Sequence, residues 1–206
     1  MEYDVVIVGA GPAGLTAAIK LKQLDPNLNV CILEKGAEVG AHILSGNVFE
    51  TKALDELIPN WRNENAPIKT KVSKEKFLFL GKNSSLSWPT WLLPAVQKNH
   101  NNYIVSLANL CRWLAEQAEK LGVEIFPGFP ASEVLYNEDG SVKGVATLDM
   151  GLDKEGNKKD GYQEGMELHA KVTVFSEGCR GHLGKQLIKK FNLDEGKNPQ
   201  QYGIGL

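Results

Sequence analysis

The clearest hydrophobic pattern of the chain lies in its first 35 residues. Residues 3–8 form a β-branched, apolar run that is too short for a helix and is typical of a buried parallel strand. Apolar side chains then recur at helical spacing over residues 15–24, and Asp25-Pro26 ends that pattern. A second short apolar run, residues 29–33, predicts another strand. The order strand, helix, strand predicts a βαβ unit and therefore a parallel sheet.

A glycine-rich turn joins the first predicted strand to the helix. Gly9, Gly11 and Gly14 have the spacing G-x-G-x-x-G. In such a unit the first glycine permits a sharp turn, the second lets the backbone approach a pyrophosphate, and the third lets the helix pack closely against the strand. The helix N-terminus also offers free N–H groups to phosphates. We therefore expect this turn, with Pro12 and Ala13, to bind a dinucleotide; the alternative is a tight turn that only shares the spacing.

A carboxylate follows at the distance that a ribose requires. Glu34 ends the second predicted strand, 20 residues after Gly14. An acidic side chain there accepts ribose hydroxyls and disfavours the 2′-phosphate of NADP, but NAD and FAD share the pattern. The glycine-punctuated segment 35–46 favours FAD, because an extended loop can run along a long cofactor; an ordinary surface connection would have the same composition. The residues of this loop that we expect to contact the cofactor are Lys35, His42, Ser45 and Gly46.

The remaining pattern predicts shorter elements and one hairpin. Ser106 is placed to cap a helix whose apolar face ends at Gly122. Residues 151–165 are polar and rich in glycine, so we expect a solvated loop there. The predicted elements are a helix over 51–57, a strand over 77–80, a helix over 107–121, a strand over 123–126, a hairpin that pairs 133–136 with 142–148, a strand over 171–175 and a helix over 183–191.

The last predicted strand places two more candidates beside the cofactor. Residues 171–175 form an apolar strand of the buried type, which ends just before Glu177 and Gly178. Open parallel sheets bind ligands at the carboxyl ends of their strands. We therefore expect Glu177 and Gly178 to contact the same cofactor as the glycine turn; the alternative is an ordinary turn between strand and helix.

Composition and charge exclude several classes of protein. Hydrophobic residues make up 42% and charged residues 23%, as in an ordinary globular domain. The 23 Lys and Arg against 25 Asp and Glu give a formal charge of −2, which provides no electrostatic reason to bind nucleic acid. No apolar run reaches the roughly 18 residues that a membrane span needs, and neither a signal peptide nor a transit peptide is expected.

Cysteine and histidine positions argue against a metal site. The cysteines, at positions 31, 111 and 179, supply neither a disulfide framework nor four thiolates, and a reducing compartment is the simplest interpretation. The 4 histidines lack the spacing of metal ligands. We expect no metal in these residues.

Several blocks of the sequence together resemble one family of flavoproteins. They lie at residues 9–46, 102–107, 113–118, 122–125, 137–147 and 177–187. The chain is similar there to the electron transfer flavoprotein-ubiquinone oxidoreductases, over nearly its whole length. The resemblance implies an α/β fold, a Rossmann-like FAD-binding domain of the glutathione-reductase type with an inserted β-rich portion. It also implies an enzyme at the bacterial or mitochondrial inner membrane that uses FAD and a 4Fe-4S cluster to pass electrons from electron transfer flavoprotein to ubiquinone.

The chain departs from that family in two respects. Three scattered cysteines cannot ligate a four-cysteine cluster, and the later Gly-Asp segment that completes FAD binding in this superfamily is absent. We therefore interpret the chain as the N-terminal part of a longer protein, incomplete at its C-terminus. The expected division is an FAD-binding domain over 1–80 and 103–191 that includes a hairpin at 132–148, a membrane- or quinone-facing loop at 81–102, and the start of an absent quinone-binding domain at 192–206.

One segment has the composition of a membrane-surface contact. Residues 86–96 contain Trp88, Trp91, Leu92 and Leu93 and show no helical or strand period. Tryptophan is favoured at a bilayer interface, because its ring can be partly in the apolar layer while its N–H group stays in contact with water. The alternative is a loop packed in the core beneath the flavin domain, and the two interpretations have similar support.

Three functions stay open at this stage. The first is an FAD-binding fragment of the oxidoreductase named above, and the second is another quinone-linked or geranylgeranyl-reductase-like flavoprotein. The third is a truncated, non-catalytic module that only binds a nucleotide. We name no catalytic residue, because in electron transfer the cofactors supply the reactivity and the protein supplies their placement.

Overall fold

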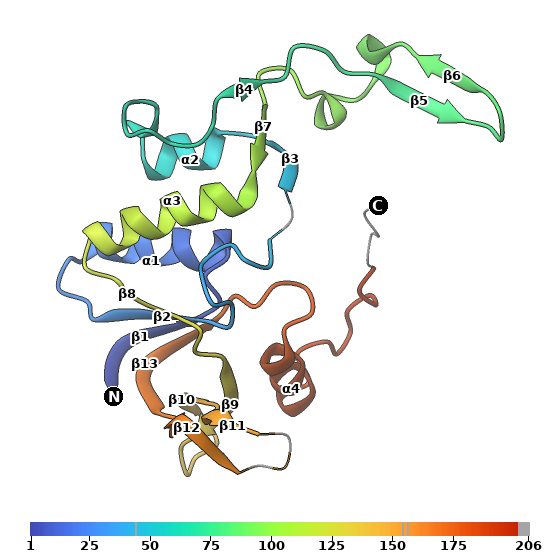
Figure 1. Ribbon diagram of the computed structural model, residues 1–206. Coiled ribbons are helices and arrows are strands. Elements are labelled where there is room, and N and C mark those ends of the chain that lie inside the picture. Colours follow the sequence, from blue (N-terminus) through green and yellow to red (C-terminus); the bar gives the residue numbers. More distant parts are fainter. Residues whose placement is uncertain (44, 154, 156, 202–206) are drawn as a thin grey trace.

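The computed structural model describes residues 1–43, 45–153, 155 and 157–201. A six-stranded sheet forms its body (Figure 1), in the order β8-β2-β1-β13-β10-β9. The first four strands of that order are parallel, and β10 and β9 are added antiparallel. These strands are β1 (Glu2–Val8), β2 (Val30–Glu34), β8 (Glu124–Pro127), β9 (Ala131–Tyr136), β10 (Val142–Thr147) and β13 (Glu167–Phe175).

Helices cover both faces of this sheet. On one face α1 and α3 pack over a core that contains Val5 and Ile7, and on the other α4 packs over a core that contains Val6 and Val8 (Figure 1). Alternate residues of β1 thus face opposite layers, as the pleat of a strand requires. The helices are α1 (Pro12–Leu24), α2 (Lys52–Leu57), α3 (Leu107–Lys120) and α4 (His182–Phe191).

The predicted start and end of α3 are confirmed. The Ser106 hydroxyl accepts a hydrogen bond from the Asn109 N–H at 3.4 Å, which satisfies one free donor of the first turn. Gly122 follows the helix with a φ of +82°, a conformation that favours glycine. The apolar face between these two points, including Leu110 and Leu114, is buried.

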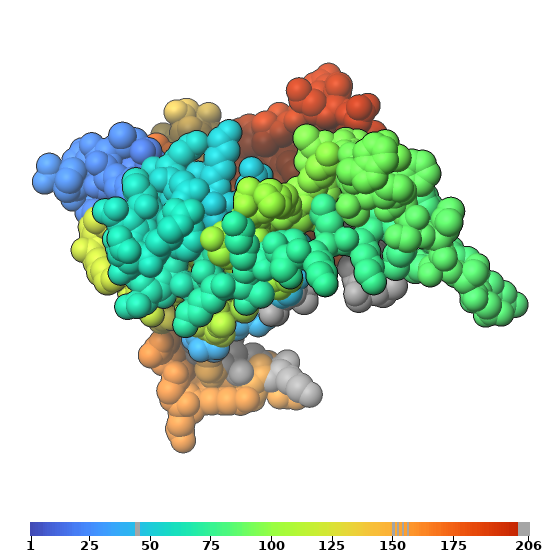
Figure 2. Space-filling view, turned by 90° about the horizontal axis from the view of Figure 1, so that it is seen from above, coloured from blue at the N-terminus to red at the C-terminus, as the bar shows by residue number. Residues whose placement is uncertain are grey.

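A second region projects from the body. An antiparallel sheet in the order β3-β7-β4 leads into a separate hairpin of β5 and β6. We call residues 69–102 the arm; it protrudes in Figure 1 and again, in green, in Figure 2. The elements are β3 (Ser45–Phe49), η1 (Trp61–Asn63), β4 (Thr70–Lys71), β5 (Phe77–Leu80), β6 (Ser85–Trp88), η2 (Thr90–Leu92), η3 (Ala95–Gln97) and β7 (Tyr103–Ser106).

The arm differs from the sequence-based expectation in one respect. Residues 85–88, part of a segment without apparent strand period, pair with β5 from Phe77↔Trp88 to Leu80↔Ser85. The four residues of β6 do alternate between serine and an apolar residue, but so short a run does not stand out from the proline-containing segment that follows it. The predicted domain boundary between residues 80 and 81 falls inside this hairpin, and the division into domains remains a prediction.

The segment 151–165 is largely exposed, as expected, but the prediction that it is a loop is wrong. β11 (Met150–Leu152) and β12 (Lys158–Gln163) form an antiparallel pair, while residues 154 and 156 lie outside the described residues. The Asp149 carboxylate supports this hairpin, accepting from the Gly165 N–H at 2.7 Å and the Tyr162 hydroxyl at 3.0 Å. A strand pair held by backbone and polar contacts leaves no hydrophobic pattern in the sequence.

The strand expected over 171–175 begins earlier and is less buried. β13 starts at Glu167, and β10 pairs with it only from Glu167 to His169. From Lys171 to Phe175 its one partner in the described structure is β1, and Val172 is 55% exposed. The expectation of a fully buried strand is therefore wrong, and one edge of the sheet is open here.

Candidate functional site

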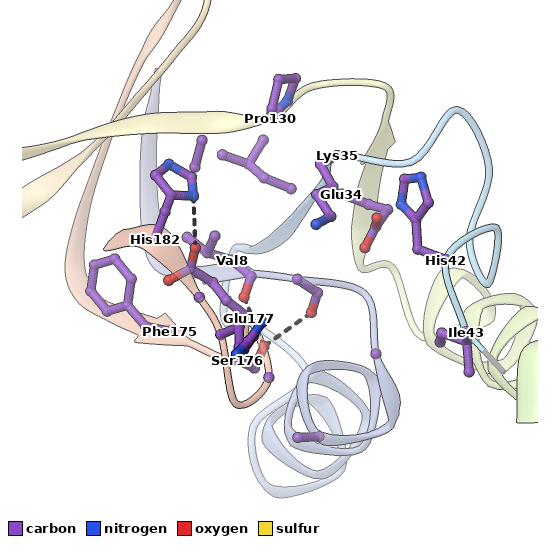
Figure 3. Close-up of a pocket in the computed structure, with 18 of the residues that line it drawn as sticks. Val8, Glu34, Lys35, His42, Ile43, Pro130, Phe175, Ser176, Glu177 and His182 are labelled. Carbon is purple, nitrogen blue, oxygen red and sulfur yellow. Dashed lines mark hydrogen bonds and ion pairs between the residues drawn. The ribbon is translucent and has the colours of Figure 1, made fainter. Parts of the chain in front are cut away.

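A cavity of about 780 Å³ lies where β1, β2 and β13 end (Figure 3). Val8, Leu33 and Phe175 are in register at the carboxyl ends of these strands, which brings three chain segments to one edge of the sheet. The volume is within the range of about 300–1,000 Å³ that cofactor sites occupy. This edge is where an open parallel sheet binds its ligands.

The glycine turn forms the floor of the cavity, and two of its glycines are required by the protein's own packing. Gly9 has a φ of +104°, and a Cβ there would lie 2.7 Å from the Ser176 carbonyl oxygen. A Cβ on Gly14 would collide with the Gly9 carbonyl oxygen and lie 3.1 Å from Ile7 Cγ2. Gly9 therefore allows the segment after β13 to approach the turn, and Gly14 allows α1 to pack against β1.

Gly11 differs from these two glycines, because no contact within the protein requires a glycine at this position. Its φ is −80°, which any residue adopts, and a Cβ there would meet no described atom within 4 Å. The missing side chain leaves open space above the turn. A ligand group that occupies this space would explain why the position is a glycine. In dinucleotide-binding motifs of this kind, that group is the pyrophosphate.

The N-terminus of α1 is open to an anion, whereas that of α4 is not. α1 has no side-chain cap and no acidic residue in its first turn, and the N–H groups of Ala13 and Gly14 have no acceptor in the described structure. At α4 the Glu177 carboxylate accepts from the Leu183 N–H at 3.3 Å and the Gly184 N–H at 2.8 Å. One helix dipole is thus neutralised by the chain itself, and the other remains available for phosphate.

Glu34 forms one wall of the cavity. Its two carboxylate oxygens accept from the Ala10 N–H at 2.9 Å and the Gly36 N–H at 2.7 Å. These bonds tie the end of β2 to the glycine turn and fix the orientation of the carboxylate. Each oxygen has a second lone pair, so the group can still accept from ribose hydroxyls.

The opposite wall comes from the end of β13. The Ser176 hydroxyl lies 2.9 Å from the Val8 carbonyl oxygen and 3.0 Å from that of Gly9, and it donates to this pair. The Glu177 side chain is only 10% exposed, and its carboxylate lies 3.3 Å from His182 Nδ1. Figure 3 shows both residues beside the floor, facing Glu34 and Lys35 across the cavity.

Most residues that the sequence nominates come together here. Those that line the cavity are Gly9, Gly11, Pro12, Ala13, Glu34, Lys35, His42, Glu177 and Gly178. Gly14 lies behind the floor, and Gly46, in β3, is not among the described lining residues. The Ser45 side chain lies outside the described part of the structure.

Sequence reasoning missed Pro130 and Phe175, which also line the cavity. Arg180 and His182 line it as well, and both lie in the block 177–187, where the sequence resembles a flavin-contacting stretch of the family. Phe175 stands two residues before Glu177, so the rule that ligands bind at strand ends would have found it. Pro130 precedes β9, and no local pattern links it to the glycine turn.

The cysteines do not form a site. Cys31 and Cys111 are buried, and burial raises the pKa of the first thiol to about 12 and of the second to about 11. Cys179 is exposed, in the loop after β13. Among the described residues, no group of three or more His, Cys, Asp or Glu side chains could hold a metal ion. These thiols do not fit a four-cysteine iron-sulfur cluster.

Comparisons with known proteins agree with this geometry. The family model described as the Thi4 family matches residues 1–57, which contain the glycine turn and Glu34. The chain is 57% identical over its full length to the electron transfer flavoprotein-ubiquinone oxidoreductase of Pseudomonas aeruginosa, of which it covers 38%. It is 52% identical, also over its full length, to the mitochondrial enzyme of that name from Bos taurus, of which it covers 34%.

Solved structures share the fold. A geranylgeranyl bacteriochlorophyll reductase-like protein from Thermoplasma acidophilum superposes with a TM-score of 0.57 at 22% identity, over 84% of this chain and 38% of the other. The predicted Rossmann-type α/β fold is thus confirmed. The family resemblance is confirmed by the names of the relatives, and the chain spans little more than a third of their length, at the N-terminal side.

Proposed function

We propose that this chain is the N-terminal, FAD-binding part of an electron transfer flavoprotein-ubiquinone oxidoreductase. The observation that carries the proposal is the identity of 52–57% to relatives of that name over every residue of the chain. The 22% identity to the geranylgeranyl-reductase-like structure is much lower, which favours the first family over the second.

The residues of the cavity fit an FAD cofactor. The open space above Gly11 and the free N–H groups of Ala13 and Gly14 would receive the pyrophosphate, and Glu34 would accept hydroxyls of the adenosine ribose. The remaining proposed contacts are Gly9, Pro12, Lys35, His42, Ser45, Gly46, Glu177 and Gly178. When bound, FAD supplies the ability to take up and release electrons. The chain's own residues bind the cofactor, fix its orientation and limit its exposure to water.

Electron transfer flavoprotein and ubiquinone are the proposed partners of the whole protein, by the names of the relatives. The 4Fe-4S cluster of the family would need thiolates from elsewhere in that longer protein, because the cysteines here do not fit it. We therefore assign no electron path through these residues. A membrane-associated location, at the inner membrane of a bacterium or mitochondrion, belongs to the same proposal.

Flavin absorbance tests the core of the proposal. We expect the purified chain to bind FAD, with absorbance near 450 nm that is retained on gel filtration or gained by titration. Gly11→Val should abolish binding while leaving the thermal unfolding temperature unchanged, because its side chain would enter empty space rather than protein. Gly140→Ala, in the turn that joins β9 to β10 at the end away from the cavity, is a control that should leave FAD binding intact.

Two outcomes would overturn the assignment. A folded chain that rejects added FAD would favour the third function, a truncated and non-catalytic module, over an FAD-binding part. Unchanged FAD affinity in Gly11→Val would place the cofactor elsewhere.

We also propose that the arm touches a membrane surface through Trp88, Trp91, Leu92 and Leu93. The core-loop interpretation does not hold for the described structure, since Trp91 is 74% and Leu92 50% exposed. Exposed tryptophan and leucine side chains on a projecting segment favour contact with the interface between a bilayer and water. No described helix has the length and apolar character to cross a bilayer.

Liposome flotation tests the membrane contact. The double variant Trp88→Ser with Trp91→Ser should lose most of the vesicle binding of the unaltered chain. If flotation is the same in both, these tryptophans make no membrane contact.

A further inference from the structure

The arm carries a charge opposite to that of the rest of the chain. Residues 69–102 contain six lysines and one acidic residue, a formal charge of +5, although the whole chain has −2 and the remainder therefore −7. The lysines are Lys69, Lys71, Lys74, Lys76, Lys82 and Lys98, all exposed. Glu75, the single acid, is already engaged: its carboxylate accepts from the Asn99 N–H at 3.0 Å and the Asn99 side-chain amide at 3.2 Å.

These lysines have no internal counterions. None of them takes part in an ion pair of the described structure, and one, Lys98, donates to the Trp91 carbonyl oxygen at 3.2 Å. Their charge is therefore available to an external anion. Clusters of four or more lysines beside an apolar surface are the usual feature by which proteins bind acidic phospholipids.

Apolar side chains alternate with these lysines along the arm. Lys76 immediately precedes β5 and Lys82 follows it by two residues, so cations bracket Phe79, which is 53% exposed, and Leu80, which is 78% exposed. Phe79 packs edge-on against Trp88 at 6.0 Å between ring centroids, which keeps the rings together without covering them. A nucleic acid would neutralise the lysines but leave these apolar groups exposed to water, whereas a bilayer with acidic lipids accommodates both.

We propose that the arm recognises anionic phospholipid headgroups, with its lysines at the phosphate level and its leucine and aromatic side chains at the acyl boundary. This inference rests on the membrane contact proposed above and adds the chemistry of the lipid. A neutral bilayer would bind the arm through its apolar side chains alone, whereas an acidic bilayer would also attract its lysines. Binding should therefore depend on both lipid charge and salt.

Vesicle flotation of the 206-residue chain with defined lipids is the test. We expect binding to vesicles with about 30% phosphatidylglycerol to exceed binding to pure phosphatidylcholine by at least about 20-fold, since each lysine near an acidic surface contributes about fivefold. Raising NaCl from about 0.05 to about 0.5 M should remove most of that difference, because the Debye length shortens several-fold.

A matched pair of variants assigns the effect to the arm. Replacing Lys71, Lys74, Lys76 and Lys82 by Gln should remove the preference for phosphatidylglycerol. Replacing four exposed lysines outside the arm, Lys52, Lys185, Lys189 and Lys197, by Gln changes the net charge equally and should leave the preference intact. Circular dichroism spectra of both variants would establish that they are folded.

The outcomes separate this inference from the proposals it rests on. Equal binding to both lipids, or an equal loss in the two variants, would overturn lipid selection by the arm while leaving the membrane contact standing. Absence of binding to either vesicle by a chain that still binds FAD would overturn the contact itself, and indicate that another part of the longer protein covers the arm.

Discussion

Burial separates the three thiols of the chain and predicts their reactivity. Cys31 and Cys111 are 0% exposed, with the pKa of each thiol raised by burial to about 12 and about 11, whereas Cys179 is exposed. Because the thiolate is the reactive form, we expect one maleimide per native chain at about pH 8 and three after unfolding. Intact mass gives the count. Rapid labelling of two or three sites in the folded protein would contradict the burial.

Asp55 is a second residue whose surroundings predict a measurable effect. Its carboxylate accepts from Trp61 Nε1 at 2.8 Å, Arg62 at 2.7 Å and the Thr51 hydroxyl at 2.9 Å, and these bonds hold the pKa of Asp55 below its usual range. A carboxyl with a lowered folded-state pKa stabilises the fold above its unfolded-state pKa of about 3.9, and this contribution is lost as the pH falls through the folded-state value.

The test is the unfolding temperature as a function of pH. Asp55→Asn should lower the unfolding temperature at neutral pH, and the difference from the unaltered chain should shrink as the pH falls below the unfolded-state pKa of about 3.9. Glu56→Gln, at an exposed neighbouring carboxylate, should have little effect at either pH. If Asp55→Asn lowers the unfolding temperature by the same amount at every pH, the charge of Asp55 is not what stabilises this turn.

Among secondary-structure elements, α4 depends on one side chain that precedes it. Glu177 accepts from the N–H groups of Leu183 and Gly184 and is nearly buried. Glu177→Ala should cost about 1 kcal/mol of unfolding free energy, as loss of a helix cap does, and Glu177→Gln, which keeps an acceptor, should cost less. Urea titration measures both, and equal stability of the Ala variant and the unaltered chain would show that the cap contributes nothing.

Elements whose signals are local were predictable from the sequence. The βαβ unit, the cap at Ser106 and the hairpin around Gly140 each depend on residues within a few positions of one another. The pair β11 and β12 left no such signal, since β11 is only three residues long, β12 is polar, and the pair is held by backbone bonds and by Asp149. Similarly, β6 alternates between polar and apolar residues over only four positions, too short a run to predict a strand.

For the whole molecule, the open edge of β13 predicts self-association. From Lys171 to Phe175 the strand has a described partner on one side only, and Val172 is 55% exposed there. Unpaired strand edges with apolar side chains recruit other strands. Val172→Lys should therefore reduce association of the chain at high concentration, measured by light scattering. Ile104→Lys is a control that should not, because Ile104 is similarly exposed but its strand, β7, is paired on both sides.

The candidate site shows what sequence can and cannot predict at this scale. The floor was predictable because Gly9, Gly11 and Gly14 carry a motif within six residues, and Glu34 follows at a known distance. The opposite wall was placed only through the general rule for strand ends. Pro130 could not have been placed at all, because its approach to the turn depends on the course of the chain from β8 into β9.

The position of β1 between β2 and β13 also affects the order of events during synthesis. The glycine turn and Glu34 leave the ribosome early, but Phe175 and Ser176, on the second wall, follow more than 140 residues after Leu33. At usual translation speeds that interval is on the order of ten seconds. Over that interval the nascent chain carries only the floor and the first wall of the cavity, and flavin capture by stalled chains should begin only when Ser176, after the end of β13, has emerged.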